Sequence, residues 1–105
     1  MRRTNRRPDQ FGIRFYGMNR QAIIVVPSSA VPRGADRVSV SVTPQGICLQ
    51  LGTSGASLRE CGGLHVCSMP GDVLQRIDPP RGSTPIDGIK MHGSRWLLPM
   101  KAKGA

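Results

Sequence analysis

Three cysteines and one histidine are close enough in the sequence to be considered as ligands of a metal ion. Cys61, His65 and Cys67 are spaced Cys-x3-His-x-Cys, and Cys48 precedes them. Tetrahedral zinc sites in proteins use thiolate sulfur and imidazole nitrogen of this kind. The sequence has no Cys-x2-Cys pair, however, and the spacing matches no zinc finger, so free thiols that pack as small apolar residues are the better interpretation. We therefore predict neither a metal site nor a cofactor.

A serine and a lysine raise the question of nucleophilic catalysis. Residues 68–74, Ser-Met-Pro-Gly-Asp-Val-Leu, together with Asp-Gly-Ile at 87–89 and Lys101, resemble a compressed form of the Ser–Lys pattern of LexA and signal peptidases. The resemblance implies that Ser68 is the nucleophile and that Lys101, kept neutral by burial, is the base. The segment that normally separates Ser-Met from Gly-Asp is missing, and Lys101 lies in a terminal tail. A Pro-Gly turn is the better interpretation, so we predict a non-enzyme with no catalytic residues and no small-molecule substrate.

The strongest signal in the composition is an excess of arginine. The chain has 105 residues, with 15 Lys and Arg against 6 Asp and Glu, and its formal net charge is +9. Twelve of the basic residues are arginine, whose planar fork of N–H donors suits phosphates and carboxylates. Such an excess attracts polyanions and acidic surfaces. We expect the partner to be nucleic acid or an acidic protein surface.

The candidate binding residues lie in an N-terminal arm and in the turns and hairpins that follow. Residues 1–10 form a basic arm in which nothing can be buried, so it either follows a phosphate backbone or is a solvated tail. Tyr16 lies between two arginines and Trp96 follows one, so each fits either base stacking or the core, whereas Phe15 is predicted to be core. The predicted binding set is Arg2, Arg3, Arg6, Arg7, Arg14, Tyr16, Arg20, Arg33, Arg37, Lys90 and Arg95.

The element that best fixes the positions of these residues is a β-hairpin over residues 37–51. Three valines alternate with Ser, Ser and Thr, and after Pro-Gln-Gly an Ile and two Leu alternate with Cys and Gln. A period of two places each apolar set on one face of a strand, and Pro followed two residues later by Gly is turn chemistry. The outward face is small and uncharged, so we interpret this hairpin as the scaffold.

The remaining elements are predicted less directly. Residues 11–27 are predicted to form a hairpin whose apolar run at 22–26 is typical of a central strand covered on both faces. Residues 28–34 are predicted as a loop with at most one helical turn, 54–61 as a short helix with Leu58 inward, and 64–66 as a strand. Residues 69–72 are predicted as a turn that leads into 73–77, and 78–85 as a loop.

A last hairpin is predicted over residues 86–100, and its segment Gly-Ile-Lys-Met-His-Gly at 88–93 echoes Gly-Ile-Arg-Phe-Tyr-Gly at 12–17. A structural echo would place two similar hairpins on either side of the central one.

The 13 Gly and 9 Pro favour many turns and few long helices. We predict an all-β fold with at most one short helix: six or seven antiparallel strands in a small barrel or sandwich. The predicted domain is 11–100, between the arm at 1–10 and a basic tail at 101–105.

Residues 22–51 also resemble a known DNA-binding family. Ala-Ile-Ile-Val-Val-Pro at 22–27, Arg-Gly-Ala-Asp-Arg-Val at 33–38 and Gln-Gly-Ile-Cys-Leu at 45–49 are similar to AbrB/MazE-type swapped-hairpin domains of transition-state regulators and antitoxins. In that family a strand ending in Ile-Pro precedes a short helix, a Gly-Asp-x-Val step and a final strand. Here the connector is short and Pro-rich, and Ala35 splits the Gly-Asp step. The resemblance implies an intertwined dimer that places Arg20, Arg33 and Arg37 on DNA.

Two classes of function fit these features. One is a small basic module that binds DNA or RNA through its arm and its Arg-bearing hairpins. The alternative is a protein-binding or assembly protein, such as a viral (phage) structural component or a small inhibitor of a host complex; a homo-oligomer or larger assembly fits both. No apolar run reaches membrane-spanning length and no apolar segment follows the basic N-terminus, so we predict no membrane partner and no secretion signal. We expect an intracellular location or one within a virus particle.

Deletion of residues 1–7 tests the arm. The deletion removes four arginines, and each lost phosphate contact lowers the slope of log affinity against log salt by roughly 0.7–0.9. We expect weaker binding to DNA or RNA and a smaller slope, measured by fluorescence anisotropy over a range of salt. No affinity of the full chain for either nucleic acid at low salt would exclude this function, and a stoichiometric complex with one protein would favour the alternative.

Overall fold

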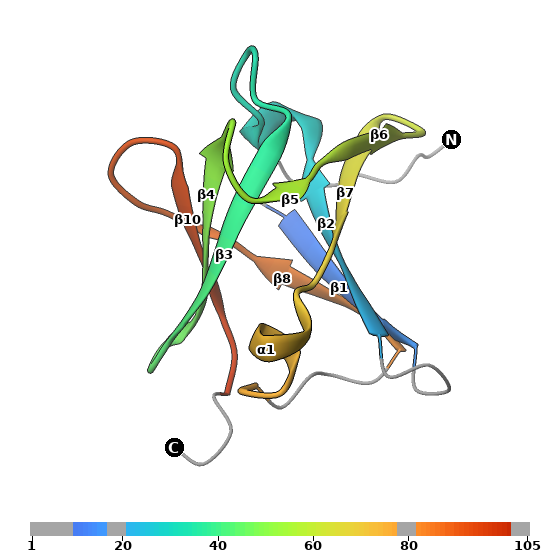
Figure 1. The fold of residues 1–105 in the computed structure, drawn as a ribbon, viewed down its shortest axis with the longest axis vertical. Helices are drawn as coiled ribbons and strands as arrows, with labels where there is room; N and C mark the ends of the chain where they lie inside the picture. The colour runs from blue at the N-terminus through green and yellow to red at the C-terminus, as the bar shows by residue number, and fades with distance from the viewer. Residues whose placement is uncertain (1–9, 17–20, 78–81, 102–105) are drawn as a thin grey trace, which may run out of the picture.

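Two antiparallel β-sheets, called sheet A and sheet B, pack face to face around one core. The structure is a computed structural model and describes residues 10–16, 21–77 and 82–101. In this part of the chain, sheet A has the strand order β6-β7-β2-β1-β8 and sheet B the order β5-β3-β4-β10-β9 (Figure 1). The predicted all-β fold, an antiparallel barrel or sandwich with at most one short helix, is confirmed.

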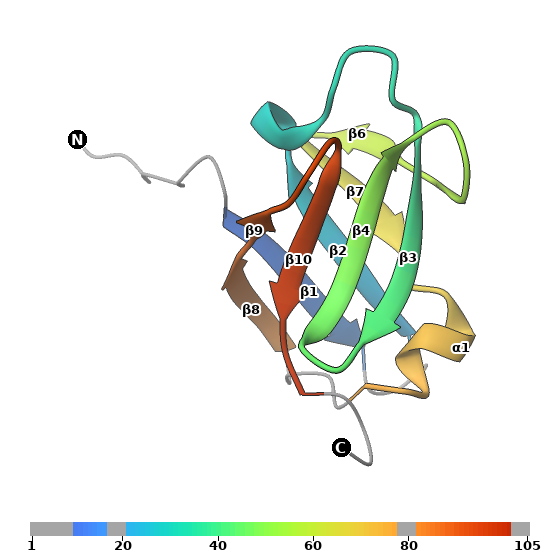
Figure 2. The same cartoon turned by 90° about the vertical axis from the view of Figure 1, so that its left-hand side faces the viewer.

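The bounds of the elements are as follows. Sheet A consists of β1 (Gln10–Tyr16), β2 (Gln21–Pro27), β6 (Arg59–Cys61), β7 (Leu64–Ser68) and β8 (Gly82–Asp87). Sheet B consists of β3 (Arg37–Thr43), β4 (Gly46–Gly52), β5 (Ala56–Ser57), β9 (Ile89–Lys90) and β10 (Arg95–Pro99). A 3-10 turn, η1 (Ser28–Ala30), follows β2, and one short helix, α1 (Gly71–Leu74), follows β7. Figure 2 looks onto sheet B, with sheet A behind it.

Two segments of the chain pass from one sheet to the other and join their edges. β8 continues through Gly88 into β9, and β5 continues through Leu58 into β6. When each is counted as one bent strand, the ten strands become eight, and all paired neighbours are antiparallel. The fold is thus a barrel flattened into a sandwich, with corners made by strands that switch sheets. The prediction of six or seven strands was too low, because the strand pieces at these corners are too short to show an alternation of apolar and polar residues.

The hairpin predicted over residues 37–51 is confirmed as β3 and β4. Its inward side chains pair across the strands, Val38 with Leu51 and Val42 with Ile47, and Val38, Leu51 and Ile47 are buried. At the turn, Gly46 has a φ of +147°, and a Cβ there would collide with the carbonyl oxygen of Leu98. The apolar face of the hairpin supplies the sheet B half of the core.

The aromatic centre of the core lies at the Gly88 corner. The rings of Phe11 and Trp96 are 5.0 Å apart between centroids and tilted by 51°, and both residues are buried. Phe15, which the sequence predicted as a core residue, is half-buried and packs against this cluster. The Phe11–Trp96 contact therefore joins the inner faces of sheet A and sheet B.

Strand β2 is central in sheet A, as predicted, but is covered on one face only. Ala22, Ile24 and Val26 point inward and are buried, whereas Ile23 and Val25 point outward and are only partly buried. The predicted cover on both faces is wrong for the outer face, which has no second layer among the described elements. This outer face of sheet A is therefore partly apolar and accessible.

Several local predictions differ from the structure. Residues 54–61 contain β5 and β6 instead of a helix, because their backbone groups pair with β3 and β7; Leu58 is buried, as predicted. Residues 82–87, predicted as part of a loop, form β8. Residues 71–74 form α1, and Val73 and Ile77 are buried at the end of the barrel that it closes. The 3-10 turn η1 fits the single helical turn predicted over 28–34.

The echo between segments 12–17 and 88–93 does not extend to structure. Ile13 is buried in sheet A, whereas the equivalent Ile89 is 52% exposed in sheet B. The hairpin of β1 and β2 also lies in the opposite sheet from the central hairpin, and of the strands in the two similar segments only β10 pairs with the central hairpin. Among the described residues, no helix has the length and apolar character needed to cross a membrane.

A substitution at the corner tests the importance of the close packing there. A Cβ atom at Gly88 would lie 2.5 Å from Phe11 Cε1 and 3.0 Å from Trp96 Cε3. Since overpacking of a core costs about 1–3 kcal/mol, Gly88→Ala should lower the free energy of unfolding by that amount in urea denaturation. Gly52→Ala is the control, because a Cβ at Gly52 meets nothing within 4 Å. Equal stability of the two variants would contradict this account.

Candidate functional site

Charge is divided unequally between the two sheets. The strands of sheet B contain Arg37, Lys90 and Arg95 and no Asp or Glu. The strands of sheet A contain two basic residues, Arg14 and Arg59, balanced by Glu60 and Asp87. Sheet B thus carries a net charge of +3, whereas sheet A is neutral.

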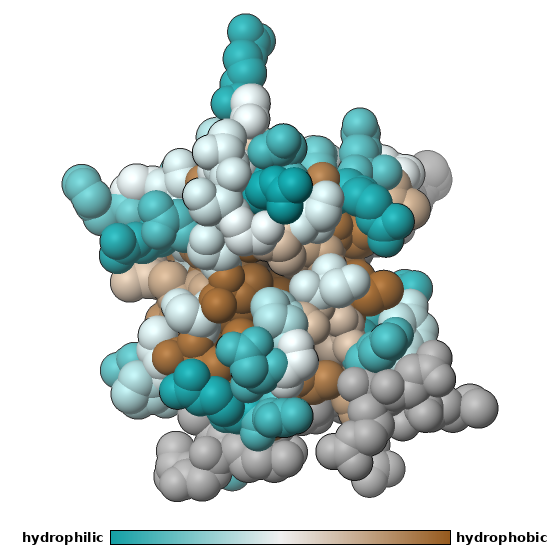
Figure 3. Space-filling view, viewed as in Figure 1, coloured by the Kyte–Doolittle hydropathy of each residue, from teal (hydrophilic) through white to brown (hydrophobic). Residues whose placement is uncertain are grey.

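The basic residues of sheet B gather at one end of the barrel, which we call the basic end. Arg37 is the first residue of β3, Arg95 is the first of β10, and Lys90 is the last of β9. Because neighbouring strands are antiparallel, these positions lie at the same end of the sheet, the upper end in Figure 2. Arg33 lies in the loop that enters β3, and all four side chains are exposed. Figure 3 shows hydrophilic residues at the two ends of the molecule and hydrophobic ones around its middle.

The register of sheet B sets the spacing of the two arginines. Arg95 is opposite Gln50, and Gln50 is opposite Ser39, two residues beyond Arg37. Arg95 is therefore two strands away from β3, at about 4.8 Å per strand, and two residues away along the strand direction, which is about 6.8 Å. Because these two displacements are perpendicular, the Cα atoms of Arg37 and Arg95 lie about 12 Å apart. Both side chains point away from the core, so they present charge on the same outer face.

Two of these cations, Arg37 and Lys90, contact neutral groups in the described part of the chain. Arg37 donates from Nη1 to the carbonyl oxygen of Gly55 at 3.0 Å, a neutral acceptor. The Lys90 ammonium lies 5.8 Å from the centroid of the Trp96 ring, within the range of a cation–π interaction. Trp96 is only 8% exposed, so it supports Lys90 from below and offers little surface for stacking.

The structure places two further predicted residues, Arg14 and Tyr16, away from this group. Arg14 lies on the outer face of sheet A and donates from Nε to the Ser83 hydroxyl at 3.0 Å. Tyr16 follows on the same strand and is 39% exposed. The predicted residues Arg2, Arg3, Arg6, Arg7 and Arg20 lie outside the described residues. Of the predicted set, the structure therefore brings together Arg33, Arg37, Lys90 and Arg95.

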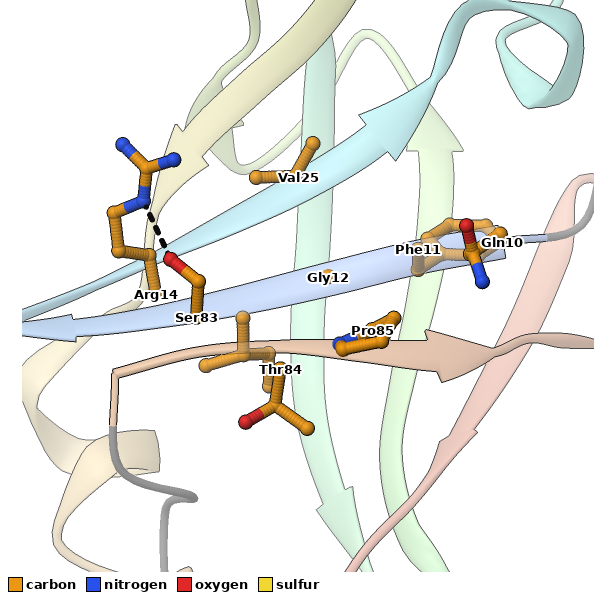
Figure 4. A pocket seen from close by; sticks show the side chains of 9 residues that line it. Gln10, Phe11, Gly12, Arg14, Val25, Ser83, Thr84 and Pro85 are labelled. Carbon is orange, nitrogen blue, oxygen red and sulfur yellow. Dashed lines mark hydrogen bonds between the residues drawn. The ribbon is translucent and has the colours of Figure 1, made fainter. Parts of the chain in front are cut away.

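A second surface, on the outer face of sheet A, was not recognised in the sequence. A hollow of about 300 Å³ lies there, and Gly12, Val25 and Pro85 are among the residues that line it (Figure 4). The only signal in the sequence was the continuous apolar run at 22–26, which was interpreted as a strand buried on both faces. The hollow depends on side chains from three strands, which no local pattern brings together.

The cysteines do not form a metal site in the described part of the chain, which includes all three of them and His65. Cys67 points into the core, Cys48 is half-buried and Cys61 is exposed. Among the described residues, no group of three or more His, Cys, Asp and Glu side chains is placed to hold a metal ion. The thiols lie in different surroundings and will differ in reactivity.

Neither Ser28 nor Ser68 has the surroundings of an activated nucleophile. The Ser28 hydroxyl donates to the carbonyl oxygen of Gly63 at 2.6 Å and lies 3.2 Å from His65 Nδ1. Because its single proton goes to the carbonyl, the imidazole must donate to the hydroxyl, and this is the reverse of a base that activates a nucleophile. Ser68 and Lys101 are both exposed, so the burial that the Ser–Lys pattern requires of its base is missing at Lys101.

Comparisons of the chain with protein-family models, with curated proteins and with solved structures gave no match. The resemblance of residues 22–51 to AbrB/MazE-type domains therefore stays a prediction. In the structure these residues form β2 in sheet A, then η1, and then β3 and β4 in sheet B. Function must be inferred from the charge and shape of the two surfaces.

The reactivity of the thiols gives a direct test of this arrangement. Burial raises the pKa of the Cys67 thiol from 9.0 to about 11, and the thiolate is the form that reacts. Near neutral pH, DTNB should label Cys61 rapidly and Cys67 only after unfolding. Equal labelling rates for Cys61 and Cys67 in the folded protein would contradict the structure.

Burial of Cys67 also makes the free energy of unfolding depend on pH. Because the thiol loses its proton at a lower pH in the unfolded chain than in the folded one, the free energy of unfolding should decline as the pH rises from 9.0 to about 11.

Proposed function

We propose that the protein is a small non-enzymatic module that binds nucleic acid, with the basic end of sheet B and the N-terminal arm as its contact surfaces. The observation that carries this proposal is the separation of charge, because sheet B has three basic and no acidic strand residues while sheet A is neutral. A uniformly basic surface meant only for solubility would not require such a separation. A concentrated positive field attracts a polyanion and raises its rate of association.

The side chains of the basic end suit phosphate groups. Arg37 is anchored through one N–H group to the Gly55 carbonyl, and its remaining donors can form paired hydrogen bonds to phosphate oxygens. Arg95 presents a second guanidinium about 12 Å away on the same face. Between them on the strands, the outward side chains are Ser39 and Gln50, which carry no charge. The exposed carboxylate of Asp36, which precedes Arg37, offsets one of the four cations at this end.

The same surface favours contacts to the backbone over contacts to bases. Among the described Phe, Tyr and Trp side chains, only Tyr16 is exposed, and it lies on sheet A. The strands of sheet B therefore offer no such ring on which an unpaired base can stack, and the exposed His92 lies in the loop between β9 and β10. Phosphate contacts position a protein but carry no sequence information, so we expect strong salt dependence and little sequence preference.

A second function, the binding of an acidic protein, is favoured by a different observation. The outer face of sheet A is neutral and partly apolar, and it includes the hollow at Gly12. Depletion of charge around an apolar centre is typical of the core of a protein interface. The two functions use different sheets and do not compete for the same residues.

Single charge removals distinguish the two sheets. Arg37→Gln and Arg95→Gln should each weaken binding to a labelled DNA or RNA duplex and lower the slope of log affinity against log salt by roughly 0.7–0.9. Arg14→Gln removes the same charge from the outer face of sheet A, away from the basic end, and should leave the slope nearly unchanged. The measurement is fluorescence anisotropy at several salt concentrations, with unfolding curves to confirm that each variant folds. Equal losses in all three variants would mean that net charge, and not the basic end, determines binding.

A further inference from the structure

The outer face of sheet A has an apolar centre and a polar rim. The row Val66, Val25, Gly12 and Pro85 crosses four neighbouring strands, because each residue is the partner of the next in the register. Ile23 lies beside this row, opposite Arg14 and Ser68. At the edge, Asp87 pairs with Gln10. An apolar centre within a polar rim is the usual anatomy of a protein interface.

The hollow in this face is centred on Gly12. It measures about 300 Å³, and Figure 4 shows Val25 on one side of Gly12 and Pro85 on the other, with Arg14 and Ser83 at one end. The neighbouring Phe11 and Ile13 point into the core, so only the missing side chain of Gly12 opens the surface. The hollow has room for one apolar side chain of a partner.

The fold itself does not require glycine at position 12. Gly12 is not among the glycines with positive φ, and a Cβ atom there would meet Thr84 O at 3.6 Å and Val25 Cβ at 3.7 Å, which are ordinary contacts. Glycine inside a strand weakens it, and it often marks a place where another molecule approaches closely. The absence of a side chain at Gly12 is therefore explained better by a bound partner than by internal packing.

Arg14 provides a charged anchor next to the hollow. Its Nε donates to Ser83 Oγ at 3.0 Å, which holds the guanidinium in one orientation. Among the described residues, this is the one hydrogen bond of the Arg14 side chain. Its terminal amino groups are therefore available for a carboxylate, which a guanidinium can bind through two parallel hydrogen bonds. Arg14 follows Gly12 by two residues and so lies on the same face, about 6.8 Å further along β1.

We propose that this surface docks an extended segment of an acidic partner protein, which places an apolar side chain in the Gly12 hollow and a carboxylate on Arg14. Residues two apart in an extended segment point to the same side with the same spacing of about 6.8 Å. Charge selects the partner, because a chain of net charge +9 repels a second copy and attracts an acidic protein. The proposal does not rest on nucleic-acid binding, which uses the opposite sheet.

The test is an NMR titration of the full chain, labelled with ¹⁵N, with short capped peptides. The probe peptide has Leu-Ser-Glu at its centre, and the matched peptides have Leu-Ser-Gln or Ala-Ser-Glu. We expect the largest shift changes at Gly12, Arg14 and Val25, and affinity for the probe about tenfold higher than for either matched peptide, since the charge-assisted bond and the buried side chain are both lost. Binding of equal strength by all three peptides would overturn the proposal.

Two variants and a control locate the site. Gly12→Ala fills the hollow and should abolish the preference for Leu while the melting temperature stays equal or rises. Arg14→Gln should abolish the preference for Glu, and Arg59→Gln, which removes the same charge from the other edge of sheet A, should change neither. Shifts confined to the basic end would overturn the proposal. So would a dimer of the unmodified chain that Gly12→Ala disrupts in sedimentation experiments, because the occupant would then be a second copy.

Discussion

The contact between Phe11 and Trp96 beneath Gly88 is the constraint on which the rest of the molecule depends. The two rings, 5.0 Å apart, come from opposite sheets and meet where β8 turns into β9. A side chain at Gly88 would occupy the space of both rings, so the corner and the aromatic pair require each other. This packing also sets the outward residues next to each ring: Gly12 follows Phe11 in sheet A, and Arg95 precedes Trp96 in sheet B. One buried contact thus fixes the two surfaces back to back.

The separation of charge follows from this arrangement of the sheets. The charged side chains on the strands of sheet B are all basic, and they lie beside neutral residues such as Ser39, Gln50 and the exposed Ile89, whereas sheet A balances its charges around an apolar centre. Charges on the outside of a sandwich stay in water, so their placement contributes little to folding. The difference between the sheets is therefore the basis of the two proposed binding surfaces. Because these surfaces face opposite directions, the two proposed partners do not compete for the same residues.

The parts of the fold that the sequence predicted are those set by local periodicity. Alternation over residues 37–51 defined the hairpin and its register, because a shift by one residue would turn Val38 and Ile47 outward. The pieces β5 and β6 are too short to alternate, and their pairing depends on distant strands. The four residues of the basic end belong to the binding set predicted from the sequence, but their grouping and the separation of Arg14 from Arg37 are consequences of sheet order. The hollow at Gly12 was not predictable, because Val25 and Pro85 reach it from strands that are distant in sequence.

Strand β2 shows why a sequence pattern and a fold can disagree. An uninterrupted apolar run is the pattern of a strand buried on both faces, yet Ile23 and Val25 are only partly buried in this chain. Exposed apolar strand surface promotes association between copies, but the net charge of +9 opposes it. The arginines thus have a second physical effect besides the one on which the proposed function rests, because their mutual repulsion opposes contact between the apolar faces of two copies. Since salt screens this repulsion over about 10 Å at moderate ionic strength, association through sheet A is expected to depend on the same electrostatics as the proposed binding of a polyanion to sheet B.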